Sequence, residues 1–409
     1  MNDNYTHINT ALQTKASNHY AGIRSAWVEI DHTQLIKNFA LINADTPQHL
    51  KKLCVVKDQA YGHGAVVVAQ AAADAGYNYL AVETIDEAIE CREANISLPI
   101  LIFGEVSDAE FAACLAYQIT CCVNDIEKAV RFNQLTKEYF AQASSVAATS
   151  LQKPSTEQPT INIHIEIDTG MSRWGVRWDD ALPVIEYIAS ECEYLHIEGL
   201  MSHFAMSDEA DKTYANTQHS RFVTVIDAIA QTDIQIELVH MSNTGGLLDL
   251  PHAHFTMIRS GILHLGVYPS LVCKRIEGLA PVMSVKANIP ALRQLHEGDR
   301  VGYGMHFTAT KPMLIAILPI GYGDGYPRVR NEGYVLIHGQ RCPVVGGNAM
   351  DATMVDVSHL PDVAIGDEVV LMGGQGDEWI DPRDLVKWKK TVCYEILTGW
   401  RARLPRRYV

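Results

Sequence analysis

Residues 53–83 read LCVVKDQAYGHGAVVVAQAAADAGYNYLAVE, and this stretch decides the fold. The runs LCVVK (53–57) and YLAVE (79–83) have the length and apolar composition of buried strands. Between them, AVVVAQAAADAG (65–76) has the apolar spacing of a helix. The pattern therefore predicts two parallel strands that are joined by a crossover helix.

The same alternation continues to about residue 270. We expect six further strands at 99–104, 119–124, 161–168, 196–203, 236–242 and 255–261. Helical spacing recurs between several of them, at 85–96, 108–118 and 180–194. Eight strands alternating with helices predict an α/β fold of the (β/α)₈ barrel type over residues 25–274.

The two ends and one insertion have a different composition. Residues 1–24 are expected to form a flexible arm, and 141–160, AQASSVAATSLQKPSTEQPT, a mobile surface loop. From about residue 275, strand-like runs alternate with Gly, Pro and Asp turns, which predicts a mainly β domain over 275–409.

Composition narrows the classes of function. A chain of 409 residues suits two domains, and its net charge of -15 argues against nonspecific binding of nucleic acid. The nine cysteines form no CxxC motif, so we expect no metal site. No run of 18 apolar residues and no signal-peptide pattern is found, so we expect a cytoplasmic protein that does not enter a membrane.

Polar and small residues follow five of the predicted strands. A barrel of this type carries its chemistry at the carboxyl ends of its strands and often holds phosphate after strands seven and eight. Five segments thus converge on one rim: Lys57, Arg173, His203, 243–246 and 259–262. A lysine amine forms a Schiff base with an aldehyde, and small residues with free N–H groups can hold a phosphate. The pattern therefore indicates pyridoxal 5'-phosphate as the cofactor.

Eight motifs then occur in the order found in one known family. They are VKxxAYGHG, DTGMSRWG, MSHFAMSDE, RSGI with GVYP, VGYG, GYGDGYPR, AMDATMVDV and CYEIL. Together they resemble the alanine racemases, which depend on pyridoxal phosphate, combine a barrel with a β domain and act as homodimers. The resemblance runs from SAWVEID (25–31) to LPRRYV (404–409).

The resemblance implies a role for each matching residue. Lys57 would hold the cofactor as a Schiff base and exchange the α-proton on one face of the substrate, and Tyr303 from the partner subunit would serve the other face. His203 would pack beside the cofactor ring, while Arg259 would face its pyridine nitrogen and leave that nitrogen unprotonated. The phosphate ligands would be Tyr61, Thr244, Gly261, Ile262 and Tyr394, with Asn243 beside them. Substrate contacts would come from Arg173, Met350, Asp351 and Tyr322.

Each of four residues also has a plain structural interpretation. Lys57 could be a strand-end lysine that reaches water. Tyr303 could be a buried aromatic residue with a hydrogen-bonded hydroxyl. His203 could be a core histidine, and Arg259 could form a salt bridge at the barrel end.

The sequence departs from the family pattern in three places. Glu166 stands where many members carry a carbamylated lysine, and we expect it to supply the same negative charge and hold Arg173. The alternative is that Glu166 pairs with another cation. In INIHIEID (161–168), the polar residues alternate with isoleucines and share one face of the strand. The other departures are Asp58-Gln59 and His264-Leu265, and we expect His264 either to pair with an acid or to be solvated.

The function implied is an alanine racemase that interconverts L- and D-alanine for peptidoglycan synthesis. A racemase of serine or of a broader set of amino acids is the nearest alternative. A decarboxylase of the same barrel type would need a catalytic cysteine in the β domain, and Cys342 and Cys393 do not lie in such a motif. A noncatalytic cofactor carrier would lack the β domain.

Overall fold

The computed structural model describes residues 24–147 and 159–409. The arm predicted at 1–24 therefore lies outside the described residues, except for Arg24. The chain divides into two compact units. Of the described residues, the β unit contains 24–35, Tyr61–Gly64 and Ala280–Val409, and the barrel unit contains Ile36–Ala60 and Ala65–Leu279.

The barrel unit is built on eight parallel strands, which confirms the predicted fold class. Their order around the sheet is β10-β2-β3-β4-β5-β6-β8-β9. Between β9 and β10 the N–H of Arg259 donates to Ser242 O at 3.0 Å, so the barrel is nearly closed. The strands are β2 (Lys51–Val55), β3 (Tyr79–Val82), β4 (Ile100–Ile102), β5 (Thr120–Val123), β6 (Ile161–Asp168), β8 (Leu195–Met201), β9 (Leu238–His240) and β10 (Met257–Ser260).

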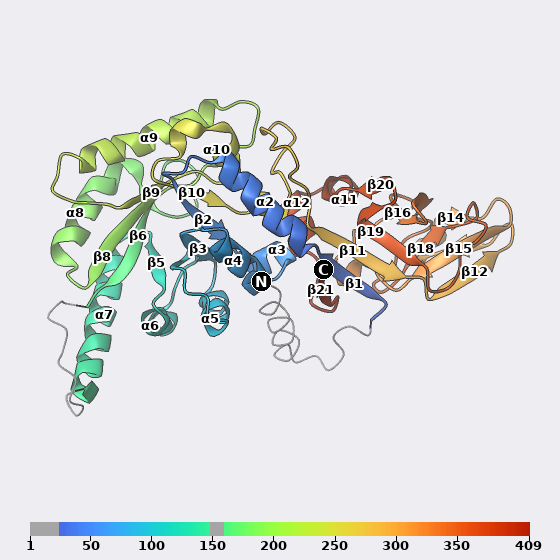
Figure 1. Ribbon diagram of the computed structural model, residues 1–409, viewed down its shortest axis with the longest axis horizontal. Coiled ribbons are helices and arrows are strands. Elements are labelled where there is room, and N and C mark those ends of the chain that lie inside the picture. The colour runs from blue at the N-terminus through green and yellow to red at the C-terminus, as the bar shows by residue number, and fades with distance from the viewer. Residues whose placement is uncertain (1–23, 148–158) are drawn as a thin grey trace. The chain divides into compact units, whose positions relative to one another are not determined.

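Helices cover the outside of these strands, and neighbours from α4 to α9 contact each other in chain order (Figure 1). Two of them begin with a capping box, in which Thr84 and Ser107 cap α5 and α6. The helices are α2 (His32–Asp45), α4 (Ala65–Asp74), α5 (Ile85–Glu93), α6 (Asp108–Tyr117), α7 (Ile126–Ala147), α8 (Ala181–Glu191), α9 (Thr213–Ile229) and α10 (Thr244–Asp249).

The predicted loop at 141–160 is wrong over its first part, because α7 continues to Ala147. Residues 141–147, AQASSVA, favour this outcome: alanine has the highest helix propensity, and extending an existing helix is far easier than starting one. Residues 148–158 lie outside the described residues. In the described parts of the chain, no helix combines the length and apolar composition needed to cross a membrane.

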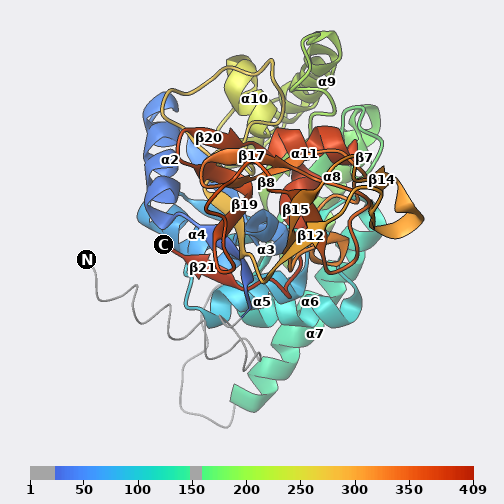
Figure 2. The same ribbon diagram turned by 90° about the vertical axis from the view of Figure 1, so that its right-hand side faces the viewer.

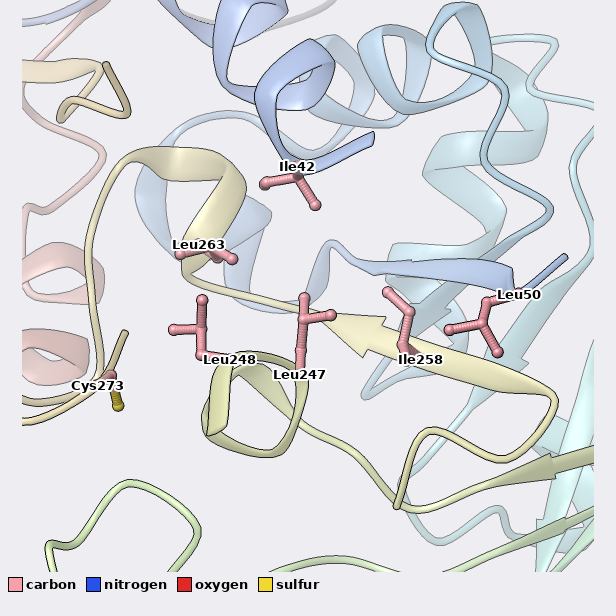
Figure 3. Close-up of a cluster of buried hydrophobic side chains, with 7 residues drawn as sticks. All are labelled: Ile42, Leu50, Leu247, Leu248, Ile258, Leu263 and Cys273. Atoms are coloured by element: carbon pink, nitrogen blue, oxygen red, sulfur yellow. The ribbon is translucent and has the colours of Figure 1, made fainter. Parts of the chain in front are cut away.

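An apolar cluster anchors the two segments that follow the last strands of the barrel. Leu247 and Leu248 of α10 lie beside Ile258 of β10 and Leu263, with Ile42 of α2 above them (Figure 3). Each buried aliphatic side chain of this kind contributes about 1.5–3 kcal/mol. The segments at 243–249 and 257–263 are therefore fixed by packing and not only by hydrogen bonds.

The β unit contains the mainly β C-terminal region, drawn in orange to red in Figure 2. Its larger sheet has the order β17-β16-β19-β11-β1-β21, and a smaller one has the order β12-β15-β18. The first strand of the described residues belongs to this sheet, because Val28 of β1 pairs with Val285 of β11. The strands and helices are β1 (Ala26–Ile30), β11 (Met283–Asn288), β12 (Ala291–Leu295), β15 (Met313–Leu318), β16 (Tyr334–Ile337), β17 (Gln340–Pro343), β18 (Thr353–Asp356), β19 (Glu368–Gln375), β21 (Arg406–Tyr408), α11 (Pro382–Lys389) and α12 (Cys393–Thr398).

The short helix after β2 is left-handed. In α3 (Lys57–Gly62) the four residues from Asp58 to Tyr61 have φ between +48° and +55°. A left-handed conformation costs roughly 1–2 kcal/mol for each residue that carries a Cβ. Such strain is retained only where the surroundings impose it, and functional sites are where it collects.

Candidate active site

Lys57 begins the left-handed helix at the end of β2, and it does not simply reach water. Its Nζ atom lies 2.8 Å from Oε2 of Glu83, the residue that follows β3. The two side chains are 30 % and 42 % exposed, respectively. Sequence reasoning missed Glu83. The signal was present, because CVVK and YLAVE are neighbouring strands that end in opposite charges.

Carboxylates of α5 hold the left-handed helix, and one of them also accepts from the unusual Gln59 side chain. The backbone N–H of Asp58 donates to Oε1 of Glu87 at 2.6 Å. Gln59 Nε2 donates to Oε2 of Glu90 at 2.5 Å. Glu87 also accepts from the backbone N–H of Glu83 at 2.8 Å. Hydrogen bonds to charged acceptors offset part of the backbone strain and tie Lys57 to the start of α5.

Arg259 of β10 is buried and is held entirely by neutral acceptors. Its two terminal nitrogens contact Nδ1 of His240 at 2.9 Å and Nδ1 of His203 at 3.0 Å. They also donate to the carbonyl oxygens of His240, Ser202 and Met241 at 2.9–3.2 Å. Burial lowers the pKa of Arg259 to about 10, so it remains a cation at neutral pH. Among the described residues no salt bridge of Arg259 is recorded, so the alternative that it is a salt-bridge residue is wrong.

A chain of hydrogen bonds leads from Arg259 through the barrel interior. His240 Nε2 lies 2.8 Å from Nδ1 of His164, and His164 Nε2 lies 3.2 Å from Oε2 of Glu198. The hydroxyl of Tyr79 donates to the same oxygen at 2.7 Å. Because the arginine only donates, His240 must accept at Nδ1 and donate from Nε2, and the same order then holds at His164. We call these four residues, His240, His164, Glu198 and Tyr79, the relay.

The pKa shifts in the relay agree with this direction of hydrogen bonding. Burial lowers the pKa of His164 and, with the charge of Arg259, holds that of His240 well below its ordinary value. Burial works to raise the pKa of Glu198, but the hydrogen bonds from His164 and Tyr79 outweigh it and leave that pKa lowered. Two neutral imidazoles therefore lie between a guanidinium cation and a carboxylate.

A bulge and a glycine make room for the relay. The register between β6 and β8 shifts at His164, which pairs with Gly199 while Ile163 pairs with Ile197, so Glu198 is the extra residue. A Cβ on Gly199 would lie 2.7 Å from three atoms of the His164 ring. The polar face predicted for 161–168 therefore faces the barrel interior at His164 and Glu166, which are 0 % and 5 % exposed.

His203 lies within electrostatic reach of the three predicted cations of the rim, Lys57, Arg173 and Arg259. Burial holds the pKa of His203 well below its ordinary value, and the charges of Arg259, Arg173 and Lys57 act in the same direction. His203 is thus a neutral imidazole that accepts from Arg259, and its place beside a cofactor ring stays a prediction.

Glu166 is a buried carboxyl whose pKa is raised. Burial is the main cause, and the positive charges of Arg173 and Arg259 oppose it. Among the described residues the structure records no ion pair between Glu166 and Arg173, which is exposed. That Glu166 holds Arg173 therefore stays a prediction.

The segments after β9 and β10 meet as predicted from the rim pattern. The backbone N–H of Gly261 donates to Oγ1 of Thr244 at 3.3 Å, and both residues and Ile262 are buried. Asn243 caps α10, because its side chain accepts from the N–H of Gly246 at 3.0 Å. Its oxygen also accepts from the Ser207 hydroxyl at 2.6 Å.

His264 lies in the barrel core. It is 0 % exposed and stacks on Phe39 with ring centroids 5.0 Å apart. Its Nδ1 atom lies 3.2 Å from the Ser260 hydroxyl. The alternative that His264 is solvated is therefore wrong.

The remaining predicted residues lie in the β unit. The rings of Tyr61 and Tyr394 are 5.9 Å apart. The N–H groups of Tyr322 and Gly323 donate to Ala349 O at 3.3 Å and Met350 O at 2.8 Å, which brings the GYGDG segment against Met350 and Asp351.

Tyr303 lies on the surface of the β unit. Its side chain is 74 % exposed, so the alternative of a buried aromatic residue is wrong. It lies between Gly302 and Gly304, whose φ values are +75° and +76°. A Cβ on Gly302 would lie 2.5 Å from Gly347 O, so only glycine fits the turn that presents Tyr303.

Comparison with known proteins gives matches along nearly the whole chain. Residues 30–269 match the N-terminal domain of alanine racemase, and 282–408 match its C-terminal domain. The alanine racemase of Halothermothrix orenii is 36 % identical over 386 residues, which cover 94 % of this chain and 97 % of that protein. The alanine racemase of Desulfovibrio desulfuricans is 37 % identical over 387 residues, covering 94 % and 98 %.

Solved structures of the same kind match as well. Alanine racemase from Clostridium difficile superimposes with a TM-score of 0.85 at 32 % identity, covering 94 % of this chain and 96 % of that one. The enzyme from Bacillus anthracis, solved with bound L-Ala-P, gives a TM-score of 0.82 at 28 % identity, covering 94 % and 95 %.

Proposed function

The chain belongs to the alanine racemase family, and we propose that it interconverts L- and D-alanine with pyridoxal 5'-phosphate bound at Lys57. The family is dependent on this cofactor and its members are isomerases. The observation that carries the proposal is the pair of cations on neighbouring strands: a lysine with an accessible amine beside a guanidinium fixed by five acceptors.

The donors present fit the cofactor. Arg259 has one N–H, at Nε, for which no acceptor is recorded among the described residues, and a pyridine nitrogen would be such an acceptor. Thr244 supplies a hydroxyl beside the N–H of Gly261 for the phosphate. Residues that would hold the cofactor are Lys57, Tyr61, His203, Asn243, Thr244, Arg259, Gly261, Ile262 and Tyr394.

When bound, the cofactor supplies an electron sink that makes the α-proton of an amino acid acidic. The chain must then remove that proton on one face and return it on the other. Lys57 would do so with Nζ, and Tyr303 with its phenolic oxygen, since both side chains can act as acid and as base. Arg259 stays charged and donates only, so it would hold the pyridine nitrogen without protonating it.

Substrate binding would fall to Arg173, Met350, Asp351 and Tyr322, with Glu166 acting behind Arg173. The exposure of Tyr303 supports a homodimer with shared active sites, in which this side chain serves the partner. Two further apolar side chains of the β unit, Met305 and Met350, are 56 % and 52 % exposed.

The test is an assay of racemisation by the purified protein loaded with pyridoxal phosphate. We expect L-alanine to lose its optical activity without release of carbon dioxide, and L-serine to react more slowly. Replacing either proton carrier, with Lys57→Ala or Tyr303→Phe, should lower kcat by about 10²–10⁴-fold or more. Faster turnover of serine, or of many amino acids, would assign the alternative substrate range. Release of carbon dioxide, or full activity in Lys57→Ala, would contradict the proposal.

A further inference from the structure

We propose that Arg403 is a positioning residue for the substrate: its guanidinium joins the two segments of the β unit that carry Tyr322 and Asp351 and holds them in the arrangement that binds the amino acid. This inference rests on the proposed function, in which both segments contact the substrate. It starts from two ion pairs of one side chain, to Asp324 at 2.8 Å and to Asp351 at 2.6 Å.

Asp324 is the fixed end of this bridge. It closes the turn Tyr322–Asp324, and its side chain is 0 % exposed. One carboxylate oxygen lies 2.7 Å from Nη1 of Arg24 and 2.8 Å from Nε of Arg403, and the other accepts the N–H of Gly321 at 3.0 Å. A buried carboxylate is tolerated only where it is paired and hydrogen-bonded. Because both of its oxygens are satisfied, Asp324 gives Arg403 a rigid anchor.

Backbone contacts place the second segment directly against this turn. The N–H of Gly323 donates to Met350 O at 2.8 Å. A Cβ on Gly323 would lie 2.7 Å from Cγ of Met350, so the glycine permits this close approach. The side chain of Asp351, by contrast, is 60 % exposed, and it contacts Nη2 of Arg403. Arg403 therefore ties the exposed side of this segment to the buried anchor.

The bridge has a consequence for substrate affinity. A binding segment that samples several arrangements has its apparent affinity reduced by the fraction of time spent in the competent one. Contacts that are equal in the ground state and the transition state change KM and leave kcat unchanged. Arg403 should therefore act on KM, whereas a residue that only supports the fold would lower stability without changing KM. An arginine suits this role, because its planar fork presents separate N–H groups to two carboxylates at once.

The first test is the steady-state kinetics of Arg403→Gln in the cofactor-loaded protein. The side chain is 46 % exposed, and Asp324 keeps its pair with Arg24, so the change leaves neither a buried cavity nor an unpaired buried charge. Exposed ion pairs are modest in strength, so we expect the KM for L-alanine to rise about two- to five-fold, with kcat within about two-fold of wild type.

A second measurement needs neither cofactor nor turnover. Amide hydrogen exchange reports local opening of a segment, and we expect exchange of residues 347–353 to be faster in the Arg403→Gln apoprotein than in wild type.

The β unit offers a matched control. Arg341 is 55 % exposed and pairs with Glu378 at 2.7 Å. Arg341→Gln therefore removes an ion pair of the same kind at a similar exposure. It should keep the wild-type KM and the wild-type exchange of residues 347–353.

A double variant tests whether Arg403 acts through Asp351. Asp351→Asn removes the same ion pair from its other side, so the effects of the two substitutions on KM should not multiply. We expect the KM of the double variant to lie close to that of the single variant with the larger effect.

The outcomes separate this inference from the proposed function. An unchanged KM in Arg403→Gln, an equal rise in Arg341→Gln, or effects that multiply in the double variant would overturn the role of Arg403. A cofactor-loaded wild-type protein that racemises no amino acid would instead overturn the proposed function. Exchange of residues 347–353 would then still decide whether Arg403 holds the segment, and equal exchange in Arg403→Gln and wild type would show that it does not.

Discussion

Lys57 and Arg259 are two cations on paired strands, and the protein holds them in opposite ways. Lys57 follows β2, is 30 % exposed, begins a strained left-handed helix and has one carboxylate partner. Arg259 lies on β10, which pairs with β2, is 2 % exposed and shares five neutral acceptors.

The difference corresponds to what each residue would have to do. A lysine that exchanges bonds and protons must lose its partner easily, and a single half-buried ion pair permits this more readily than five acceptors would. An arginine that must keep its charge and direction needs its terminal nitrogens fixed, and neutral acceptors hold both terminal nitrogens of Arg259. The weakly held lysine and the firmly held arginine thus come from adjacent strands of one barrel.

The strongest test of this contrast is the stability of the two alanine variants. Arg259→Ala leaves His240, His203 and three carbonyl oxygens without their donor, and we expect it to cost about 3–5 kcal/mol. Lys57→Ala removes one half-buried ion pair and should cost about 1 kcal/mol or less. Urea unfolding of the apoproteins measures both, and equal losses would remove the distinction.

A second test adds a methyl group beside the relay, the set of residues that is hydrogen-bonded to Arg259. In Gly199→Ala the new Cβ would lie 2.7 Å from the His164 ring, so the ring or β8 must move. Overpacking of this kind costs about 1–3 kcal/mol. Gly347→Ala is the control, because its Cβ would meet Tyr303 O at 3.4 Å, an ordinary contact. A thermal midpoint in Gly199→Ala as high as in the control would show that the relay is loosely packed.

A third test uses pH and the buried carboxyl. The pKa of Glu166 is raised by burial, so its ionisation weakens the fold, and stability is lost as pH rises above the ordinary glutamate range of about 4.3. Glu166→Gln should therefore melt higher than wild type at about pH 8, and the gap should close toward about pH 4. A gap that widens as the pH falls would contradict the assigned direction.

The smallest expected effect lies in the left-handed helix. Asp58 is exposed with φ +53°, and its backbone N–H makes the bond with Glu87, so a glycine there keeps that bond. Asp58→Gly should stabilise the protein by up to about 1 kcal/mol. Asp86→Gly, in the right-handed helix α5, should instead destabilise it by a similar amount. Melting temperatures that move in the same direction would contradict a left-handed helix at Asp58.

The barrel could be predicted from the sequence, because strands and helices alternate along the chain. The local periodicity of apolar residues reveals this alternation. It gave no indication that β1 pairs with β11, since the partner of Val28 is Val285. The left-handed helix was also beyond prediction, because Asp58 to Tyr61 contain no glycine and their conformation depends on carboxylates of α5.

The polar face at His164 and Glu166 followed from simple alternation along the strand. The relay did not, because a bulge brings Glu198 into it and its other members come from separate strands. The roles of Lys57, Tyr303 and the remaining matched residues came from the family resemblance, and they stay predictions until tested by experiment.

The central claim is that Lys57 binds pyridoxal phosphate covalently. Its most direct test is reduction of the cofactor-loaded protein with borohydride, followed by peptide mass analysis. We expect one modified peptide with the cofactor on Lys57, and none from Lys57→Ala. Label on another lysine, or none in the wild-type protein, would contradict the account.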